Sequence, residues 1–146
     1  MEDTLLKYIY ECHQWLSELE KEPRDFGTGE FLNPSEIHTL AAVERRPRCN
    51  LTKLADELGI SKAATSKFTS SLARKGYLVK HLPEKEQGRD VFFTLTVMGK
   101  KAVLGHKSFT RSAFRPLLSV EQKLSVEDKE TIKKFLEGLL FAAGKK

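Results

Sequence analysis

The sequence predicts a mainly α-helical domain with one small β-hairpin. Apolar residues recur at helical steps of three and four in several segments, and capping residues and glycines mark where those helices begin and end. Only one segment combines two runs rich in β-branched and aromatic residues with a polar loop between them. The 146 residues are 40% hydrophobic and 31% charged, which suits a single compact domain over 1–146.

Two helices are expected in the first third of the chain. Residues 4–19 carry apolar side chains at helical spacing, which predicts an amphipathic helix. Residues 23–29 are expected to form a connector. Asn33 then caps a second helix that runs to about Arg45. The cap is expected because a proline follows Asn33 and Glu36 stands where it can reach back to the cap.

Two shorter helices follow, in a helix-turn-helix arrangement. Asn50 caps the first over 51–58, and Gly59 turns the chain at its end. Ser61 caps the second, which ends at Gly76. Ala55 supplies the small side chain needed where the helices cross. The core expected beneath them consists of Leu54, Leu58, Ile60 and Phe68.

The rest of the chain is expected to form a hairpin and two helices. The hairpin pairs residues 77–82 with 90–96, and Thr96 caps a helix towards Phe114 that Pro116 kinks or ends. Ser125 starts the last helix. Apolar residues of the first and last helices are expected to hold a dimer together: Leu5, Ile9, Trp15, Phe135 and Leu139.

Charge is unevenly distributed along the chain. Residues 1–30 hold three basic and eight acidic residues, whereas 61–115 hold twelve basic and three acidic ones, within a formal net charge of +5. A basic segment of this kind is expected of a nucleic-acid-binding surface, because neutralising phosphates releases condensed counterions. A solvated basic face would have the same composition, so charge alone does not decide.

The second short helix has one small, polar and basic face. Its expected DNA contacts are Ser61, Lys62, Ala63, Ser66, Lys67, Ser70 and Arg74. Such a face fits the major groove, where lysine donates to guanine and serine bonds to base edges or phosphates. Lys85 and Arg89 in the hairpin tip suit a phosphate or the minor groove. The alternative function is a winged-helix protein-interaction module without specific DNA binding.

The sequence lacks the motifs expected of enzymes, membrane proteins and disulfide-rich proteins. The sequence shows no nucleophile with a base, no paired catalytic carboxylates and no phosphate-binding glycine loop, so we expect neither an enzyme nor a cofactor. No apolar stretch approaches the roughly 18 to 20 residues of a membrane span. The two cysteines, Cys12 and Cys49, form no disulfide framework. We expect a cytoplasmic protein that does not bind membranes.

Three stretches of sequence resemble a known family. They are LTKLADELGIS over Leu51–Ser61, KFTSSLARKGYLV over Lys67–Val79, and Arg89 followed by Leu95-Thr96 and Gly99. Together they are similar to the MarR family of winged helix-turn-helix transcription regulators, over about residues 32–107. The resemblance implies a homodimer that binds a pseudo-palindromic operator in double-stranded DNA, most often as a repressor. It implies dimerisation helices over 1–31 and 115–146, and a winged-helix lobe with its connecting helix over 32–114.

The resemblance also implies roles for single residues. Arg89 would be the wing arginine, and the recognition-helix contacts would be Ser61, Lys62, Ser66 and Lys67. Two residues depart from the family pattern. Gln87 stands where an aspartate usually braces the wing, and Thr65 stands at a core position more often held by valine.

Three residues are candidates for an effector pocket: His38, His106 and Cys12. Glu36–Thr39 (EIHT) and His106–Phe109 (HKSF) resemble a branch of the family that represses fatty-acid synthesis genes and responds to acyl chains on acyl carrier protein. This points to a small apolar or acyl effector. Cys12 lies on the first helix, where peroxide-sensing relatives keep a reactive cysteine.

The two histidines leave several alternatives open. They could share a structural hydrogen bond, or they could bind zinc together with Glu30, Glu36 or a cysteine. No metal site is expected, because the ligands lack tight spacing along the sequence. A pocket for an apolar molecule at the dimer interface, or no ligand at all, also fits.

Overall fold

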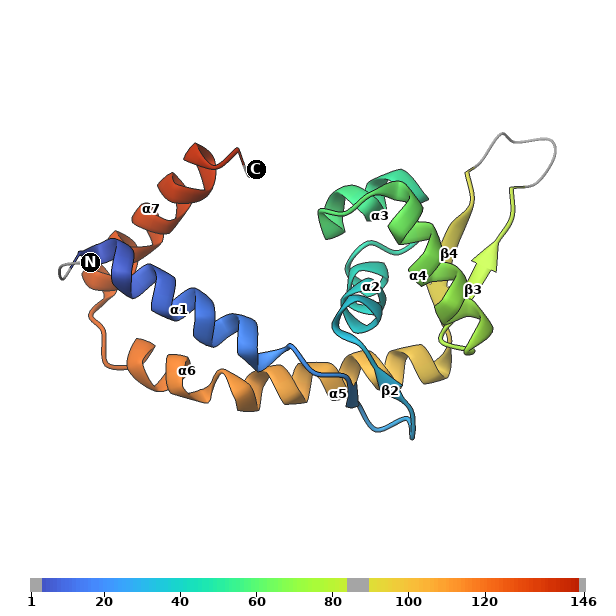
Figure 1. Ribbon diagram of the computed structural model, residues 1–146, viewed down its shortest axis with the longest axis horizontal. Helices are drawn as coiled ribbons and strands as arrows, with labels where there is room; N and C mark the ends of the chain where they lie inside the picture. Colours follow the sequence, from blue (N-terminus) through green and yellow to red (C-terminus); the bar gives the residue numbers. More distant parts are fainter. Residues whose placement is uncertain (1–3, 84–89, 145–146) are drawn as a thin grey trace. The chain divides into compact units, whose positions relative to one another are not determined.

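The computed structural model describes residues 4–83 and 90–144 and divides the chain into two units, 1–109 and 110–146. Over the described residues the chain forms seven α-helices and two two-stranded sheets (Figure 1). The elements are, in order, α1 (Leu5–Leu19), β1 (Arg24–Asp25), β2 (Phe31–Leu32), α2 (Pro34–Arg45), α3 (Leu51–Leu58), α4 (Lys62–Arg74), β3 (Leu78–His81), β4 (Phe92–Leu95), α5 (Val97–Ala113), α6 (Arg115–Glu121) and α7 (Val126–Ala142). The predicted mainly α-helical class with a β-hairpin is confirmed.

The connector expected between the first two helices is in fact a second, very short hairpin. β1 pairs antiparallel with β2, with Arg24 opposite Leu32 and Asp25 opposite Phe31. The Asp25 carboxylate accepts hydrogen bonds from the backbone N–H groups of Gly27, Thr28 and Gly29, at 2.8, 2.9 and 3.0 Å. This side chain holds the turn closed and brings the chain back to the start of α2.

α2 begins with the capping box that the sequence predicts. The Asn33 side chain accepts from the Glu36 N–H at 2.9 Å, and the Glu36 carboxylate accepts from the Asn33 N–H at 3.1 Å. Most of α2 is buried, because it packs against α3, α4 and β4. It is the central helix of the first unit.

α3 and α4 form the predicted helix-turn-helix. Asn50 caps α3, Ser61 caps α4, and Gly59 between them has φ +65°, a left-handed conformation that favours glycine. The two helices pack against each other, and α4 also packs against β3 (Figure 1). The expected core is partly wrong here: Leu54 is buried, Leu58 and Phe68 are half-buried, and Ile60 is exposed. Ile60 follows the turn directly and lies at the surface.

The β3–β4 hairpin is the predicted wing. β3 and β4 pair antiparallel from Leu78 opposite Leu95 to His81 opposite Phe92. Thr96 closes its base: its hydroxyl donates to the Gly76 carbonyl at 2.6 Å and accepts from the Gly99 N–H at 3.0 Å. The wing tip, with Lys85, Gln87 and Arg89, lies outside the described residues.

One hydrophobic core holds the first unit together. Its buried members are Phe26, Leu32, Ile37, Leu40, Ala42, Val43, Leu54, Leu72, Tyr77, Leu78, Phe93, Ala102 and Val103. They come from the β1–β2 hairpin, every helix from α2 to α5, and the wing. The core therefore fixes α4 and the wing on α2 and α5.

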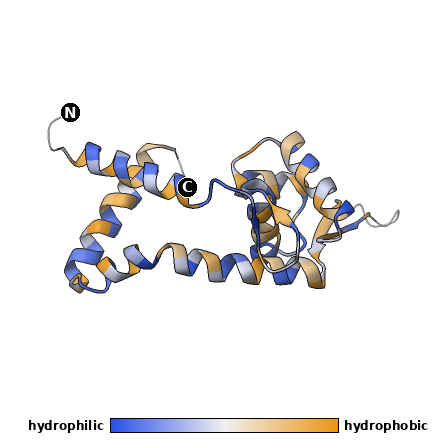
Figure 2. Ribbon diagram, turned by 60° about the horizontal axis from the view of Figure 1, so that its bottom comes forward, coloured by the Kyte–Doolittle hydropathy of each residue, from blue (hydrophilic) through white to orange (hydrophobic). Residues whose placement is uncertain are grey.

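The second unit contains the end of α5 together with α6 and α7. The sequence predicts α7 with its Ser125 cap. It does not predict α6, because a proline such as Pro116 usually ends or kinks a helix, whereas here it lies in the first turn of a new one. Hydrophobic positions recur along these helices (Figure 2), and no residue of α6 or α7 is buried. No helix in the described ranges is both long and apolar enough to cross a membrane.

Candidate nucleic-acid interface and effector pocket

The outer face of α4 carries all seven residues that the sequence assigns to DNA contact on this helix or its cap. Thr65, Thr69 and Leu72 turn inward and are buried. The exposed residues are Ser61, Lys62, Ala63, Ser66, Lys67, Ser70 and Arg74. Helical periodicity therefore gives α4 one buried face and one exposed face. We call the exposed face, with the seven residues just named, the free face.

The free face of α4 combines basic residues with short side chains. Lys62, Lys67 and Arg74 make no ion pair with any residue in the described ranges, and no acidic residue lies in the first turn of the helix. Alanine and serine contribute only short side chains between them. A helix face of this kind can approach base edges closely, while its positive N-terminus favours phosphate oxygens.

The two threonines on the inner face of α4 have their hydroxyls satisfied within the helix. Thr65 donates to the Ser61 carbonyl at 3.0 Å, and Thr69 donates to the Thr65 carbonyl at 2.9 Å. A buried hydroxyl without a partner would be costly, so these bonds allow threonine at both buried positions. Thr65, a departure from the expected pattern, therefore fits the core.

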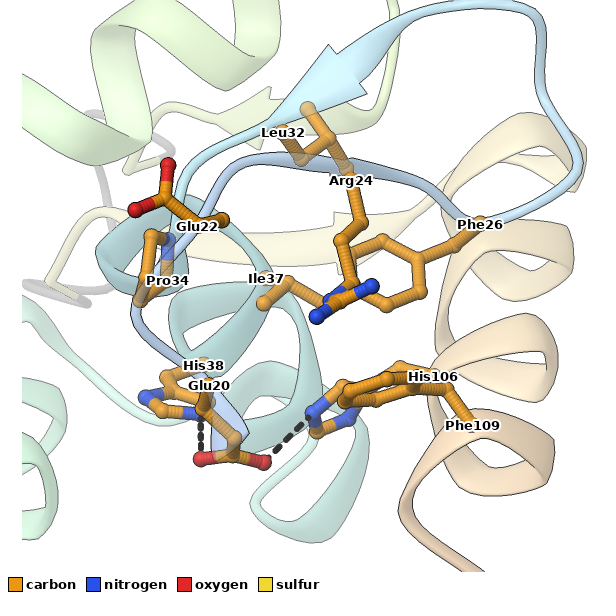
Figure 3. Close-up of a pocket in the computed structure, with 10 residues that line it drawn as sticks. All are labelled: Glu20, Glu22, Arg24, Phe26, Leu32, Pro34, Ile37, His38, His106 and Phe109. Carbon is orange, nitrogen blue, oxygen red and sulfur yellow. Dashed lines mark hydrogen bonds and ion pairs between the residues drawn. The ribbon is translucent and has the colours of Figure 1, made fainter. Parts of the chain in front are cut away.

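A second candidate site lies where the end of α1 meets α2 and α5. The pocket is lined by Glu20, Glu22, Arg24, Phe26, Leu32, Pro34, Ile37, His38, His106 and Phe109 (Figure 3). Its volume is about 10 Å³, which matches a single water molecule. An acyl chain would therefore require these side chains to move apart.

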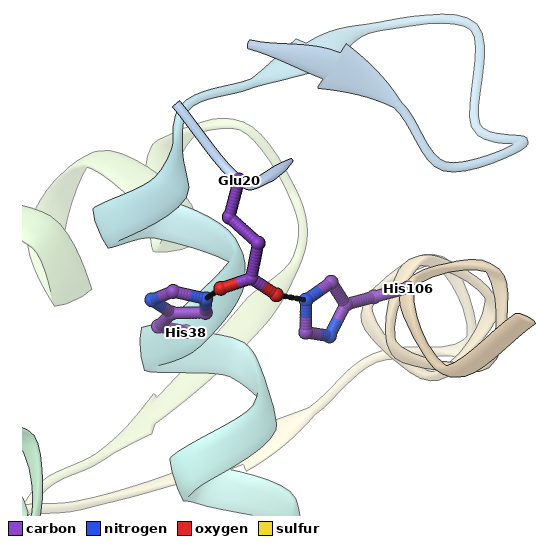
Figure 4. A group of neighbouring side chains, drawn as sticks. All are labelled: Glu20, His38 and His106. Atoms are coloured by element: carbon purple, nitrogen blue, oxygen red, sulfur yellow. Dashed lines mark hydrogen bonds and ion pairs between the residues drawn. The ribbon is translucent and has the colours of Figure 1, made fainter. Parts of the chain in front are cut away.

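Glu20 joins the two histidines that the sequence singles out (Figure 4). Its Oε2 lies 2.9 Å from Nε2 of His38, and its Oε1 lies 3.3 Å from Nε2 of His106. The two rings stand 5.6 Å apart between centroids, and each finds its hydrogen-bond partner in the carboxylate. The two histidines lie close together but bond to Glu20 and not to each other. Glu20 follows α1 directly and carries no motif that marks it in the sequence.

The surroundings of His106 are apolar and aromatic. The Phe26 and His106 rings are perpendicular with their centroids 5.3 Å apart, Phe26 also contacts Phe109, and the Arg24 guanidinium lies 4.4 Å from the centroid of the Phe109 ring. Burial lowers the pKa of the His106 imidazole below its ordinary value, although the Glu20 carboxylate opposes this shift. Burial therefore favours the neutral form of the ring.

Gly105 allows this close packing. A Cβ at Gly105 would overlap the carbonyl oxygen of Phe26 and lie 2.8 Å from its carbonyl carbon. Only glycine lets α5 come this near to the β1–β2 segment. The contact places His106, the next residue of α5, against Phe26.

The other sequence candidates lie apart from this pocket. Cys12 is exposed on α1 and is not among the lining residues. Glu30 contacts the Tyr77 hydroxyl, and Glu36 contacts Lys75, so neither joins the histidines in the part of the chain that the structure describes. Cys49 is half-buried near the end of α2, where burial raises the pKa of its thiol.

Comparison with known proteins places the central segment in a family. The MarR family model matches residues 32–85. The uncharacterised HTH-type transcriptional regulator YhjH of Bacillus subtilis is 30% identical over 112 residues, which is 76% of this chain. The chain spans 63% of the length of YhjH, less than two thirds.

Two solved structures share the fold. Lactococcus lactis ZitR in complex with DNA has a TM-score of 0.71 at 19% identity, covering 96% of this chain and 98% of that one. ZitR is also described as a zinc-responsive MarR family member. The adhesin competence repressor AdcR of Streptococcus pyogenes has a TM-score of 0.72 at 24% identity, with 97% of each chain covered. Residues 32–85, which contain α2, the helix-turn-helix and β3, therefore match the MarR family model.

Proposed function

We propose that the protein is a sequence-specific double-stranded DNA-binding transcriptional regulator. The observation that carries the proposal is the free face of α4, which is exposed, basic and bounded by short side chains. YhjH is described as an HTH-type regulator, and the ZitR structure contains DNA, which supports the same function for this chain. The proposed contacts on α4 and its cap are Ser61, Lys62, Ala63, Ser66, Lys67, Ser70 and Arg74. Lys85 and Arg89 in the wing are proposed from the sequence alone.

The active form is proposed to be a homodimer. The second unit has an apolar groove of about 430 Å³ between α6 and α7, in which Leu117, Val120, Ile132, Leu136 and Leu140 are exposed in the single chain. Exposed apolar surface of this kind favours association. Two copies related by a two-fold axis would present two α4 helices to half-sites roughly 34 to 36 Å apart. Such a dimer would act as a repressor by covering a promoter.

The proposed regulator responds to an effector held near His38 and His106. The resemblance to fatty-acid synthesis repressors favours an acyl effector, and the description of ZitR as zinc-responsive favours a metal. The small pocket volume favours the metal. Cys12 is exposed in α1 and, as a proposed redox sensor, would act away from this pocket.

Fluorescence anisotropy of labelled duplexes tests the function. The protein is titrated into a pool of fragments from its own genome's promoters and, separately, into a random duplex at several salt concentrations. Tighter binding to some promoter fragments, with an affinity that falls steeply with salt, supports the regulator. No binding to either DNA at low salt would refute it and favour the protein-interaction module.

A further inference from the structure

Three donor atoms from three separate segments converge in the first unit. They belong to Glu20 after α1, His38 in α2 and His106 in α5, and they all lie within 4.8 Å of one another. We propose that these three residues bind a divalent transition-metal ion of the zinc type. Metal binding stands independently of DNA binding, whereas its regulatory consequence rests on the proposed function.

The spacing of the donors matches zinc. Tetrahedral zinc with bonds of about 2.0 to 2.1 Å places its ligand atoms about 3.3 Å apart. The Glu20 oxygens lie 2.9 Å from the His38 nitrogen and 3.3 Å from the His106 nitrogen. Small movements of these side chains would therefore place all three donor atoms on one ion.

The donor set selects the class of ion. Two imidazole nitrogens with one carboxylate suit zinc and neighbouring first-row metals, whereas magnesium and calcium prefer oxygen ligands alone. Three protein ligands leave one coordination position for water or another small ligand. The His38 side chain is 41% exposed, so an ion can reach the site from solvent.

The packing around the site prepares it for a metal. The perpendicular Phe26 ring and the tight approach at Gly105 hold the His106 ring, and the adjoining pocket has the volume of one water molecule. Ordered ligands and a dry shell on one side are typical of metal centres. The opposite side, at His38, remains open for exchange with solvent.

Metal binding here would act on α4 through α2. α2 carries His38 and packs directly against α3 and α4, and the ion pair of Glu44 with Lys107 at 2.7 Å already ties α2 to α5. A metal would add bonds between α2, α5 and the end of α1. These bonds would hold the helix-turn-helix in one arrangement before DNA binds. We therefore expect zinc to raise the affinity for DNA about tenfold.

Competition with a chromophoric chelator measures the metal site directly. The full-length protein, stripped of metal, is titrated with zinc chloride in the presence of the chelator, with magnesium chloride as a parallel titration. We expect one zinc per chain and no competition by magnesium. Glu20→Gln, His38→Gln and His106→Gln should each weaken zinc binding by at least about 100-fold.

Matched variants control for nonspecific loss. Glu18→Gln and His13→Gln change exposed residues of α1, and His81→Gln changes a histidine that bonds to Thr94, so zinc affinity should stay unchanged in all three. Circular dichroism of each variant checks that it folds. Cobalt(II) bound to the unaltered protein should give the intense visible bands of four-coordinate geometry, which tests the site without any substitution.

The outcomes separate the two proposals. Two results would overturn the metal site while leaving the DNA-binding proposal standing. One is that zinc does not bind at one ion per chain. The other is that zinc binding survives His38→Gln and His106→Gln but is lost in Cys49→Ser. If the protein binds zinc, but its affinity for a duplex is the same with and without zinc, only the regulatory part of the proposal is overturned. If no duplex binds at all, the proposed function fails, and the chelator titration still decides the metal site.

Discussion

The Glu36 carboxylate lies 2.6 Å from the Nζ atom of Lys75, although the two residues are 39 positions apart in the sequence. Glu36 is buried, and its second oxygen closes the capping box at Asn33. Lys75 ends α4. One carboxylate therefore caps α2 and also holds the C-terminal end of the proposed recognition helix.

Removing either partner of this pair should destabilise the fold. Lys75→Met leaves the buried carboxylate without its cation, and we expect a loss of about 1 to 3 kcal/mol in the free energy of unfolding, below the usual cost for a fully buried pair because Lys75 is partly exposed. Urea denaturation measures it. The control is Lys129→Met, whose pair with Glu121 is exposed and should contribute less than about 0.5 kcal/mol. Equal losses in the two variants would contradict this role.

Gly105→Ala should damage the packing that positions His106. The added Cβ would overlap the Phe26 backbone, so α5 and the β1–β2 segment must separate, at a cost of about 1 to 3 kcal/mol. Gly138→Ala is the matched control, because nothing lies near its Cβ and alanine is favoured in a helix by about 0.5 to 1 kcal/mol. Thermal unfolding of both variants gives the comparison. Stabilisation by both substitutions would show that the contact at Phe26 is unimportant.

Asp25 should make stability depend on pH. Backbone N–H groups of its turn, Gly29 first, hold the pKa of the Asp25 carboxyl below its ordinary value of 3.8. Because the folded-state pKa is the lower one, the stabilisation is present above the unfolded value and is lost as pH falls through the folded value. Asp25→Asn should therefore melt at a lower temperature than the original protein near neutral pH, and this difference should shrink as the pH falls below 3.8. A difference that persists in acid would assign the effect to something other than the charge.

Leu136→Glu should dissociate the proposed homodimer. Leu136 lies in the apolar groove of α6 and α7, and a carboxylate there would have to be buried in the dimer. Analytical ultracentrifugation should show a dimer for the original protein and a monomer for the variant. Lys134→Glu on the opposite face of α7 also adds a negative charge and should leave the dimer intact. A dimer in both cases would place the interface elsewhere.

Local signals make much of the fold predictable from the sequence. Asn33, Asn50 and Ser61 each bond to a backbone N–H three residues later, so each cap can be recognised in a window of four residues. Gly59 ends α3 for an equally local reason, its positive φ. The α4 face follows from helical periodicity alone, so the exposure of Lys67 is predictable.

The features that the sequence does not reveal depend on contacts between distant residues. Glu20 meets His38 across 18 positions and His106 across 86, and nothing next to Glu20 marks it. The β1–β2 hairpin has only two residues per strand, too few for an alternating pattern. Ile60 is apolar but exposed, which shows that hydrophobicity alone does not assign burial at a turn.

The most direct test of the central claim compares three proteins on one promoter duplex selected by anisotropy: the original protein, Lys67→Ala and Lys134→Ala. Lys67 lies on the free face of α4, whereas Lys134 is an exposed lysine of α7. Lys67→Ala should weaken binding by about 1 to 3 kcal/mol if the lysine reads a base, or reduce the salt slope by about one if it contacts a phosphate. Lys134→Ala should bind as the original does. Equal affinity and equal salt dependence for all three proteins would contradict the assignment of α4 as the DNA-reading helix.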